Sequence, residues 1–399
     1  MRLSLAFILI TVGIDAMGIG LILPIMPALI TEVQGGTLSD AALWGGVLSA
    51  SFAVMQFLFG PVLGNLSDAY GRRPVLLVSL AVMTLDYLVM ALAGSIWLLL
   101  LGRIVGGITA ATHSTAGAYM ADISAPEEKA ARFGLLGAAL GLGFVAGPVL
   151  GGLLGELGTR APFYAAALLA GLNFLLGFFV MRETVPADGR RPFQWRQAGP
   201  LGAFRALGRL PGIRPLLSVY FLYSVAVYVY PAIWAYFTAA RFDWSPQMIG
   251  VSLGLYGISM ALVQGVLIRP ATSWLGERGA VIAGFGFEAV AFAILSVLAS
   301  GTIALILIPV TALGALVQPA ITAILSRRVD ASRQGELQGV MASLHALSMI
   351  LSPLGMGVVF AAFTREAAPI HLPGAPFLVA LVLMLFALVL FLRAGRSVT

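Results

Sequence analysis

The 399-residue sequence contains no cysteine and only three histidines. Without cysteine the chain can form neither disulfides nor thiolate metal sites, and it has no cysteine nucleophile. Charged residues are also scarce, because Asp, Glu, Lys and Arg together make up 10% of the chain, against about 25% in an ordinary soluble domain. So few charges cannot build a normal polar surface, so most of the outside must face lipid.

Hydrophobic residues make up 60% of the sequence. Gly, Pro and short polar clusters divide them into twelve stretches, each near the about 20 residues that a membrane-spanning helix needs. The first stretch is longer than the about 7 to 15 apolar residues of a signal peptide and has no cleavage site, so we interpret it as a retained span. The predicted fold is an all-α membrane protein with twelve transmembrane helices, at 5–30, 43–66, 74–93, 97–120, 133–155, 161–182, 214–240, 246–267, 280–299, 302–325, 337–363 and 372–393.

The basic residues predict the orientation of these helices. With the N-terminus inside, inner segments carry 19 of the 23 basic residues, and the outer loops carry only Arg160, Arg241 and Arg365. This asymmetry places both termini in the cytoplasm. The net charge of +6 is therefore a topology signal, and nucleic acid is not expected as a partner.

The longest polar break, between Arg182 and Arg214, leaves six predicted helices on each side. The inner linkers 121–134 and 326–339 both follow the fourth helix of their half and resemble each other weakly. Repeated halves are common in secondary transporters. We therefore expect an N-terminal six-helix bundle at 1–182, a cytoplasmic linker at 183–213 and a C-terminal six-helix bundle at 214–399.

Three charged residues fall at a similar depth inside predicted spans of the first half: Asp15, Asp86 and Arg103. A charge near the bilayer centre costs about 2.5–3.5 kcal/mol on insertion scales, so such residues need a partner or a purpose. Two interpretations are open. The three form a structural ion pair between helices, or the acid that one guanidinium cannot neutralise takes up a proton.

Glu288 is the buried acid of the second half, where no basic residue lies within a predicted span. Burial without a neighbouring cation disfavours the charged form of a carboxyl group. Glu288 is therefore a candidate proton carrier. The alternative is a permanently protonated, hydrogen-bonded or snorkelling side chain.

Several polar and aromatic side chains in the spans are candidates for a ligand site. Gln56, Gln264 and Gln318 must bond a neighbouring helix or line a wet cavity, because an unpaired polar group in lipid is costly. Tyr228 and Tyr230 are too central for the interfacial aromatic belt, and they either pack or contact a planar apolar ligand. His113 either titrates or packs.

Gly143, Gly147, Gly151 and Gly155 repeat every four residues on the fifth predicted helix and share one face. Such a stripe of small residues lets another helix approach closely. We interpret it as a packing feature without chemistry of its own.

Several segments resemble the tetracycline/proton antiporters of the drug-efflux branch of the major facilitator superfamily. They are IDAMGIGLILPIMP at 14–27, GNLSDAYGRRPVLL at 64–77, LGRIVGGITAAT at 101–112, GAYMADIS at 117–124, GFVAGPVLGG at 143–152 and LSRRVDASRQGELQG at 325–339. The resemblance covers nearly the whole chain. It implies a fold in which two six-helix bundles alternately open a central cavity to each side.

The resemblance also implies roles for particular residues. An inner gate would be formed by Gly64, Asp68, Gly71, Arg72 and Arg73, with Asp68 against the positive N-terminal end of a neighbouring helix. Coupling or substrate roles are implied for Asp15, Gln56, Asp86, Arg103 and Gln264. Glu288 stands where the family has an acidic proton site, usually Asp.

The sequence departs from the family pattern at three places. Met260 stands in a stretch of the eighth helix where members commonly carry His, and His113 replaces a small residue. The loop RPATSWLGERG of the second half lacks a counterpart of Asp68. These departures concern the substrate more than the fold.

The sequence thus predicts a monomeric exporter in the bacterial inner membrane that exchanges an amphipathic drug, tetracycline first, for protons. It needs no cofactor, although the cargo could travel as a divalent-metal chelate. The candidate substrate contacts are Gln56, His113, Tyr228, Tyr230, Met260, Gln264 and Gln318. The alternatives are a proton-coupled carrier of another organic compound and a membrane receptor or scaffold. An enzyme is not expected, because the sequence has no HExxH motif, no nucleotide-binding loop and no soluble domain.

Overall fold

The computed structural model describes residues 2–186, 190, 192–194, 199 and 212–394, which form helices and connecting loops without a β-strand. Most of the predicted linker at 183–213 lies outside these residues. The first part contains α1 (Arg2–Ile22), α2 (Met26–Gln34), α3 (Leu38–Tyr70), α4 (Arg72–Leu92), α5 (Ile96–Ile108), α6 (Thr112–Asp122), α7 (Lys129–Gly155) and α8 (Ala161–Val180). The second contains α10 (Arg214–Val227), α11 (Val229–Phe242), α12 (Pro246–Leu262), α13 (Ile268–Val297), α14 (Gly301–Thr311), α15 (Val317–Arg327), α16 (Gln334–Thr364) and α17 (Ala375–Ala394). Short 3₁₀ and π segments, η2 (Val263–Leu267), η3 (Ala312–Leu316) and η4 (Ala331–Arg333), connect some of them.

Within the described residues, 11 helical segments are long and apolar enough to cross a membrane. The longest, Pro246–Val297, has 52 residues, and at about 1.5 Å per residue it exceeds twice the about 30 Å of a bilayer core. Gly276 interrupts it with a positive φ of 68° and a ψ of 168°. The segment therefore holds the eighth and ninth predicted spans, and the twelve-helix fold is confirmed.

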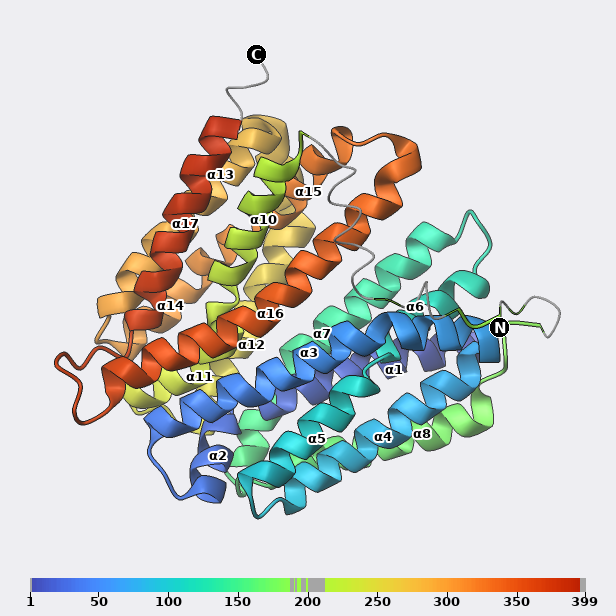
Figure 1. Cartoon of the computed structure of the whole chain (residues 1–399), viewed down its shortest axis with the longest axis horizontal. Coiled ribbons are helices and arrows are strands. Elements are labelled where there is room, and N and C mark those ends of the chain that lie inside the picture. The colour runs from blue at the N-terminus through green and yellow to red at the C-terminus, as the bar shows by residue number, and fades with distance from the viewer. Residues whose placement is uncertain (1, 187–189, 191, 195–198, 200–211, 395–399) are drawn as a thin grey trace. The chain divides into compact units, whose positions relative to one another are not determined.

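The contacts between helices divide the chain into two compact units. Of the described residues, the first unit holds those within 1–35, 51–200 and 245–254, and the second holds those within 36–50, 201–244 and 255–399. Helices α3 and α12 thus contribute one end to each unit. In the first unit α1 packs on α7 and α4 on α8, and in the second α10 packs on α16 and α13 on α17. In each half, the first span therefore packs on the fifth and the third span packs on the sixth. Both halves use the same pairings (Figure 1).

The glycine stripe of α7 lies against the backbone of α1, as the spacing predicts. A Cβ atom on Gly147 would lie 2.5 Å from the Met17 carbonyl oxygen. Cβ atoms on Gly143 and Gly151 would likewise overlap carbonyl oxygens of α1, those of Gly13 and Leu21. Only residues without a side chain allow this close approach of the two helices.

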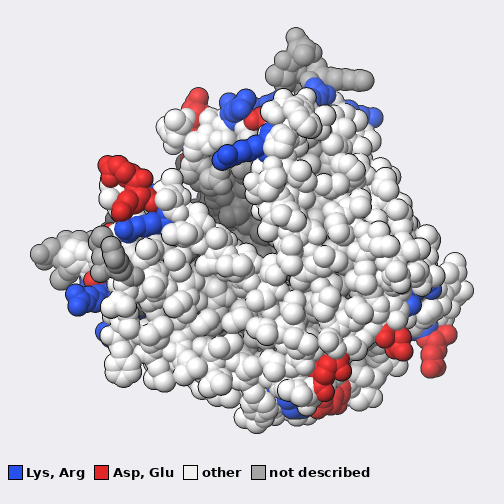
Figure 2. Space-filling view, turned by 180° about the vertical axis from the view of Figure 1, so that it is seen from behind, with Lys and Arg blue, Asp and Glu red and all other residues white. Residues whose placement is uncertain are grey.

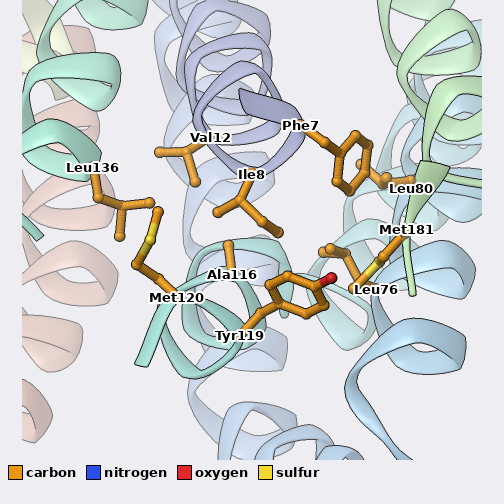
Figure 3. Packing of buried hydrophobic residues seen from close by; sticks show 10 residues of the cluster. All are labelled: Phe7, Ile8, Val12, Leu76, Leu80, Ala116, Tyr119, Met120, Leu136 and Met181. Atoms are coloured by element: carbon orange, nitrogen blue, oxygen red, sulfur yellow. The ribbon is translucent and has the colours of Figure 1, made fainter. Parts of the chain in front are cut away.

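A hydrophobic cluster fixes one end of the first unit (Figure 3). It joins α1, α4, α6 and α7 through Phe7, Ile8, Val12, Leu76, Leu80, Ala116, Tyr119, Met120 and Leu136, together with Met181. The hydroxyl of Tyr119 donates to the carbonyl oxygen of Arg182 at 3.0 Å. The cluster therefore positions the chain that leaves α8, which carries an acid of the polar network described below.

Prolines account for two of the following three breaks in the predicted continuous helices. The prediction that the first span runs to residue 30 is wrong, because α1 ends at Ile22 and a turn containing Pro24 precedes α2. The seventh span breaks at Tyr228, between α10 and α11. Pro231 follows three residues later, and proline cannot donate a hydrogen bond to the carbonyl four residues earlier. Thr109 ends α5 in the middle of the fourth span, although no proline follows.

Two further irregular segments pack against each other in the second unit. The π-helical η2 precedes Pro270, and the 3₁₀-helical η3 precedes Pro319. Each proline leaves a carbonyl of the preceding turn without its helical donor. Val263 of η2 forms one buried cluster with Ala312 and Leu316 of η3. Such interruptions in spanning helices are tolerated where protein or a cavity surrounds them.

The surface of the described residues matches a lipid environment. Large apolar side chains are exposed along the helices, for example Phe179 at 80% of its full area. Figure 2 shows charged side chains gathered in a few small groups, with broad uncharged surface between them. A soluble monomer rarely exposes continuous apolar surface of this extent, so the chain is a multi-pass membrane protein.

Candidate functional site

Asp86 of α4 and Arg103 of α5 form a buried ion pair. Their side chains are joined through Asp86 Oδ2 and Arg103 Nη2, and the two residues are 6% and 9% exposed. The guanidinium also lies over the ring of Phe52, 5.2 Å from its centroid. A desolvated pair of this kind stabilises only while both partners are present.

Glycines of α5 make room for the Asp86 carboxylate. A Cβ atom on Gly102 would lie 2.7 Å from Asp86 Oδ1, and one on Gly106 would lie 2.8 Å from Oδ2. Within the described part of the chain, Asp86 Oδ1 and Arg103 Nε are buried without a hydrogen-bond partner. The pair is therefore not fully satisfied, which is unusual for buried polar groups.

Asp15 of α1 remains outside this pair. Among the residues that the structure describes, no ion pair or hydrogen bond is found for its carboxylate. Unlike Asp86, Asp15 is partly exposed. The structure thus brings two of the three predicted charges together and leaves one carboxylate over.

The two other candidates of the first unit, Gln56 and His113, are accessible. Gln56 lies partly exposed on α3, and His113 is exposed in the first turn of α6. His113 follows the interruption of the fourth span that begins at Thr109.

Glu288 of α13 is enclosed in the second unit and is 1% exposed. Its Oε2 accepts a hydrogen bond of 3.1 Å from the Tyr230 hydroxyl. It makes no ion pair with any residue in the described ranges. A buried acid without a counter-ion is a functional candidate by default.

The remaining candidates of the second unit differ in exposure. Tyr228 is partly exposed at the break between α10 and α11, and its ring lies 6.2 Å from that of His345. Met260 is partly exposed on α12. Gln264 is exposed in the π-helical η2, and Gln318 is exposed at the start of α15. Tyr230 is buried, and its hydroxyl faces Glu288.

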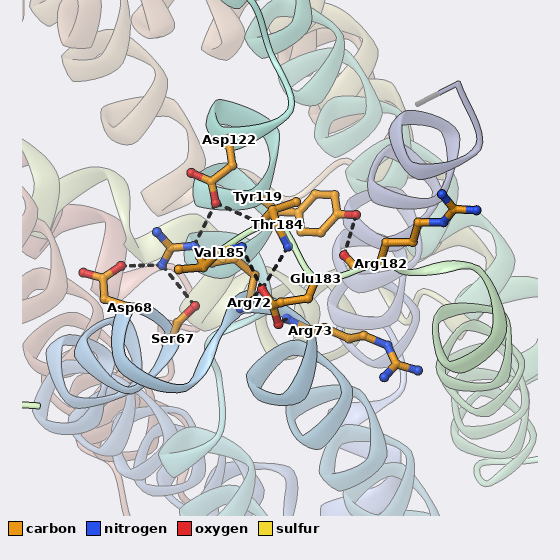
Figure 4. Close-up of polar contacts among 10 residues, drawn as sticks. All are labelled: Ser67, Asp68, Arg72, Arg73, Tyr119, Asp122, Arg182, Glu183, Thr184 and Val185. Carbon is orange, nitrogen blue, oxygen red and sulfur yellow. Dashed lines mark hydrogen bonds and ion pairs between the residues drawn. The ribbon is translucent and has the colours of Figure 1, made fainter. Parts of the chain in front are cut away.

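The predicted inner gate forms a polar network centred on Arg72, shown in Figure 4. The Arg72 guanidinium contacts Asp68 at 2.5 Å and Asp122 of α6 at 3.1 Å. It also donates to the Ser67 hydroxyl at 3.2 Å. Arg73 donates to the carbonyl oxygen of Phe178 at 2.8 Å. The network joins α3, α4, α6 and α8 at one end of the first unit.

Glu183 occupies the N-terminus of α4. Its carboxylate accepts the backbone N–H groups of Arg72 at 2.9 Å and Arg73 at 3.1 Å, and also those of Thr184 and Val185. A negative group at this position satisfies unpaired N–H groups and complements the helix dipole. Gly71 has a φ of 106°, and a Cβ atom there would overlap Glu183.

This arrangement differs from the predicted one. We expected Asp68 at the positive N-terminal end of a neighbouring helix, but in the described residues Asp68 pairs with the Arg72 side chain and Glu183 caps α4. Gly64 lies partly exposed on α3, one turn before Asp68. Sequence reasoning missed Glu183 and Asp122. The sequence does contain a signal for such an acid. A helix that starts directly after Gly71 leaves the backbone N–H groups of Arg72 and Arg73 without helical acceptors, so a nearby acidic side chain is expected to bind them.

We expect Glu183→Ala to weaken the start of α4. Hydrogen bonds to a charged group contribute about 1.5–3 kcal/mol each, net of solvation, so faster amide exchange at Arg72 and Arg73 and a lower melting temperature should follow. Hydrogen–deuterium exchange with mass spectrometry measures the first effect. The matched control is Glu127→Ala, because Glu127 is exposed and outside the network. Equal exchange in both variants would contradict the capping role.

Comparison with known proteins agrees with this fold. Residues 8–353 match the sequence model of the Major Facilitator Superfamily, so the chain belongs to this superfamily of membrane transporters. Within it, the chain groups with the tetracycline resistance proteins. It is 45% identical over 359 residues to the class C protein of Escherichia coli, covering 90% of each chain. It is 39% identical over 364 residues to the class G protein of Vibrio anguillarum, covering 91% of each.

Solved structures show the same fold. The human organic anion transporter MFSD10 is 26% identical, with a TM-score of 0.70 and coverage of 98% of this chain and 99% of that one. A variant of the nucleoside transporter NupG is 14% identical, with a TM-score of 0.82 and the same coverage. The second likeness shows the fold alone.

Proposed function

We propose that the protein exports tetracycline from the bacterial cytoplasm in exchange for protons. The observation that carries the proposal is its 45% identity, over 90% of both chains, to a tetracycline resistance protein. The proposed orientation has both termini in the cytoplasm, as the distribution of Arg and Lys in the sequence indicates. The proposed working unit is the monomer.

Glu288 is the proposed proton carrier. Its burial and lack of a counter-ion mean that losing a proton costs much unless another positive or polar group compensates. Cationic cargo, or cargo carried as a divalent-metal chelate, could supply that compensation on the cytoplasmic side. Inward movement of one proton across the membrane is worth about 2.3 kcal/mol per 100 mV, which can drive export.

Asp15, Asp86 and Arg103 are the proposed second charged cluster of the cycle. The Asp86–Arg103 pair leaves Asp15 without a basic partner in the described part of the chain. A single unpaired carboxylate that is partly exposed can exchange protons with water or attract cationic cargo. We assign substrate contact to the accessible candidates Gln56, His113, Tyr228, Met260, Gln264 and Gln318.

The Arg72 network is the proposed inner gate. In alternating access the halves 1–182 and 214–399 would rock about the linker 183–213. The contacts of Arg72 with Asp68 and Asp122 hold the ends of three helices together, and the contact of Arg73 with Phe178 adds a fourth, so the unit moves as a rigid body. Gly71 leaves room for Glu183, and Gly64 is included in the proposed gate because the resemblance to the family implies it.

Everted membrane vesicles test the proposed function, because their cytoplasmic face is outside. We expect saturable accumulation of tetracycline when the vesicle lumen is made acidic, and its loss when a protonophore dissipates the gradient. The assay should include an organic anion and a nucleoside beside tetracycline. Gradient-driven accumulation of another compound without tetracycline would favour a different carrier, and accumulation of none would favour a receptor or scaffold.

A further inference from the structure

The hydrogen-bond partner of Glu288, Tyr230, belongs to a cluster of aromatic side chains. Tyr230 of α11 is hydrogen-bonded to the Glu288 carboxylate. Tyr223 of α10 is hydrogen-bonded to the neighbouring Gly314 turn, and the ring of Tyr256 of α12 lies 5.8 Å from that of Tyr230. No Arg, Lys or His within the described ranges pairs with Glu288. An ionised carboxylate in such a place depends on the few hydrogen-bond donors that reach it.

The Tyr230 hydroxyl is the donor that reaches the carboxylate, at 3.1 Å from Oε2. Among the described residues, no other hydrogen bond to the Glu288 carboxylate is found. A phenol can donate or accept. Tyr230 can therefore donate to the carboxylate and, after its O–H bond rotates, accept the proton of the neutral acid without moving its ring.

Packing holds the Tyr230 ring in place. The residue is 7% exposed. Its ring centroid lies 5.4 Å from that of Phe292, 5.8 Å from Tyr256 and 6.0 Å from Phe377. These aromatic neighbours on α12, α13 and α17 restrict the rotation of the Tyr230 ring. The Tyr230 hydroxyl therefore keeps its position next to Glu288.

The opposite side of Glu288 is closed by the backbone of η3. A Cβ atom on Gly314 would overlap the Glu288 carboxyl group. The Gly314 carbonyl oxygen accepts a 3.1 Å hydrogen bond from the Tyr223 hydroxyl, which fixes this turn. The carboxyl group thus lies between a fixed turn and a fixed phenol, and it cannot swing away in either direction.

We propose that Tyr230 is the positioning residue of Glu288: its hydroxyl holds the carboxyl group against the Gly314 turn in both protonation states. The proposal rests on the proposed function, in which Glu288 carries the proton. It assigns Tyr230 to proton coupling, whereas the sequence suggested substrate contact. Glu288 exchanges its proton only while this contact keeps the carboxyl group in one orientation.

Infrared difference spectroscopy of the purified protein, acid minus alkaline, tests the proposal. The carbonyl stretching band of protonated Glu288 is identified by its absence in Glu288→Gln. A hydrogen bond to the acid weakens its C=O bond, so Tyr230→Phe should move the band to higher wavenumber. Gradient-driven tetracycline transport should fall about tenfold, the effect of losing about 1.4 kcal/mol.

Tyr256→Phe is the matched control, because it removes a hydroxyl from the same aromatic cluster that is not hydrogen-bonded to Glu288 in the described structure. Its band should stay at the wild-type position. A band unmoved by Tyr230→Phe would overturn the proposal. If Tyr230→Phe does not fold, Glu288→Asp withdraws the carboxyl group by one methylene and should cause the same upward shift. No shift there would also overturn it.

The failure of the proposed function would look different. If Glu288→Gln transports tetracycline as well as the wild type does, Glu288 carries no proton in the cycle, whatever the band does. The transport assay and the band position therefore separate the two failures.

Discussion

Glu288→Gln abolishes accumulation of tetracycline against its gradient while leaving exchange of tetracycline between equal concentrations intact. Glutamine has nearly the shape of protonated glutamate and can still accept from Tyr230, so the aromatic cluster keeps its packing. It cannot release a proton, and the step that couples cargo to protons stops. Everted vesicles with an imposed pH gradient measure the first activity, and counterflow of labelled tetracycline measures the second.

The control for this prediction is Glu366→Gln, which removes an exposed acid of the second unit. It should retain both activities. Uphill accumulation by Glu288→Gln at more than about a tenth of the wild-type rate would show that another acid carries the proton, because full uncoupling removes the about 2.3 kcal/mol per 100 mV that each proton supplies.

Breaking the Asp86–Arg103 pair destabilises the protein more than removing both charges. Asp86→Asn leaves the buried guanidinium without its counter-charge, which typically costs about 3–5 kcal/mol. The double variant Asp86→Asn with Arg103→Gln replaces the pair by two neutral amides and should regain most of the lost stability. Thermal unfolding of the detergent-purified proteins measures this difference.

Arg365→Gln provides the comparison with an exposed pair. Asp40 and Arg365 lie 3.8 Å apart with 37% and 54% of their side chains exposed, so its loss should cost less than about 1 kcal/mol. If the double variant is no more stable than Asp86→Asn, the pair is not a desolvated unit. Transport should be lost in both the single and the double Asp86 variant. The double variant regains stability but still lacks the charges of the Asp15, Asp86 and Arg103 cluster.

Counting residues along spans predicted that Asp15, Asp86 and Arg103 lie at a similar depth. The rise of a helix is nearly constant, so depth in the membrane follows from sequence position, and Asp86 and Arg103 lie at one depth. Depth alone left open which acid pairs with Arg103. The glycines Gly102 and Gly106, which admit Asp86, decide that choice, and their effect depends on how the two helices face each other.

The partner of Glu288 could not be predicted in the same way. Tyr230 follows the helix break at Tyr228, and a break changes the rotation of every later side chain. Helical periodicity therefore does not fix where Tyr230 points. Glu183 was missed because it lies in the irregular segment after α8. Residue spacing in an irregular segment does not predict where a side chain points.

Simultaneous recording of tetracycline and protons in reconstituted liposomes tests the central claim most directly. A pH-sensitive dye inside the liposomes and the fluorescence of tetracycline follow both fluxes in one sample. The account predicts that outward-directed cargo always moves opposite to protons and that Glu288→Gln removes both net fluxes. Net tetracycline transport by the wild type without any accompanying proton flux would contradict it.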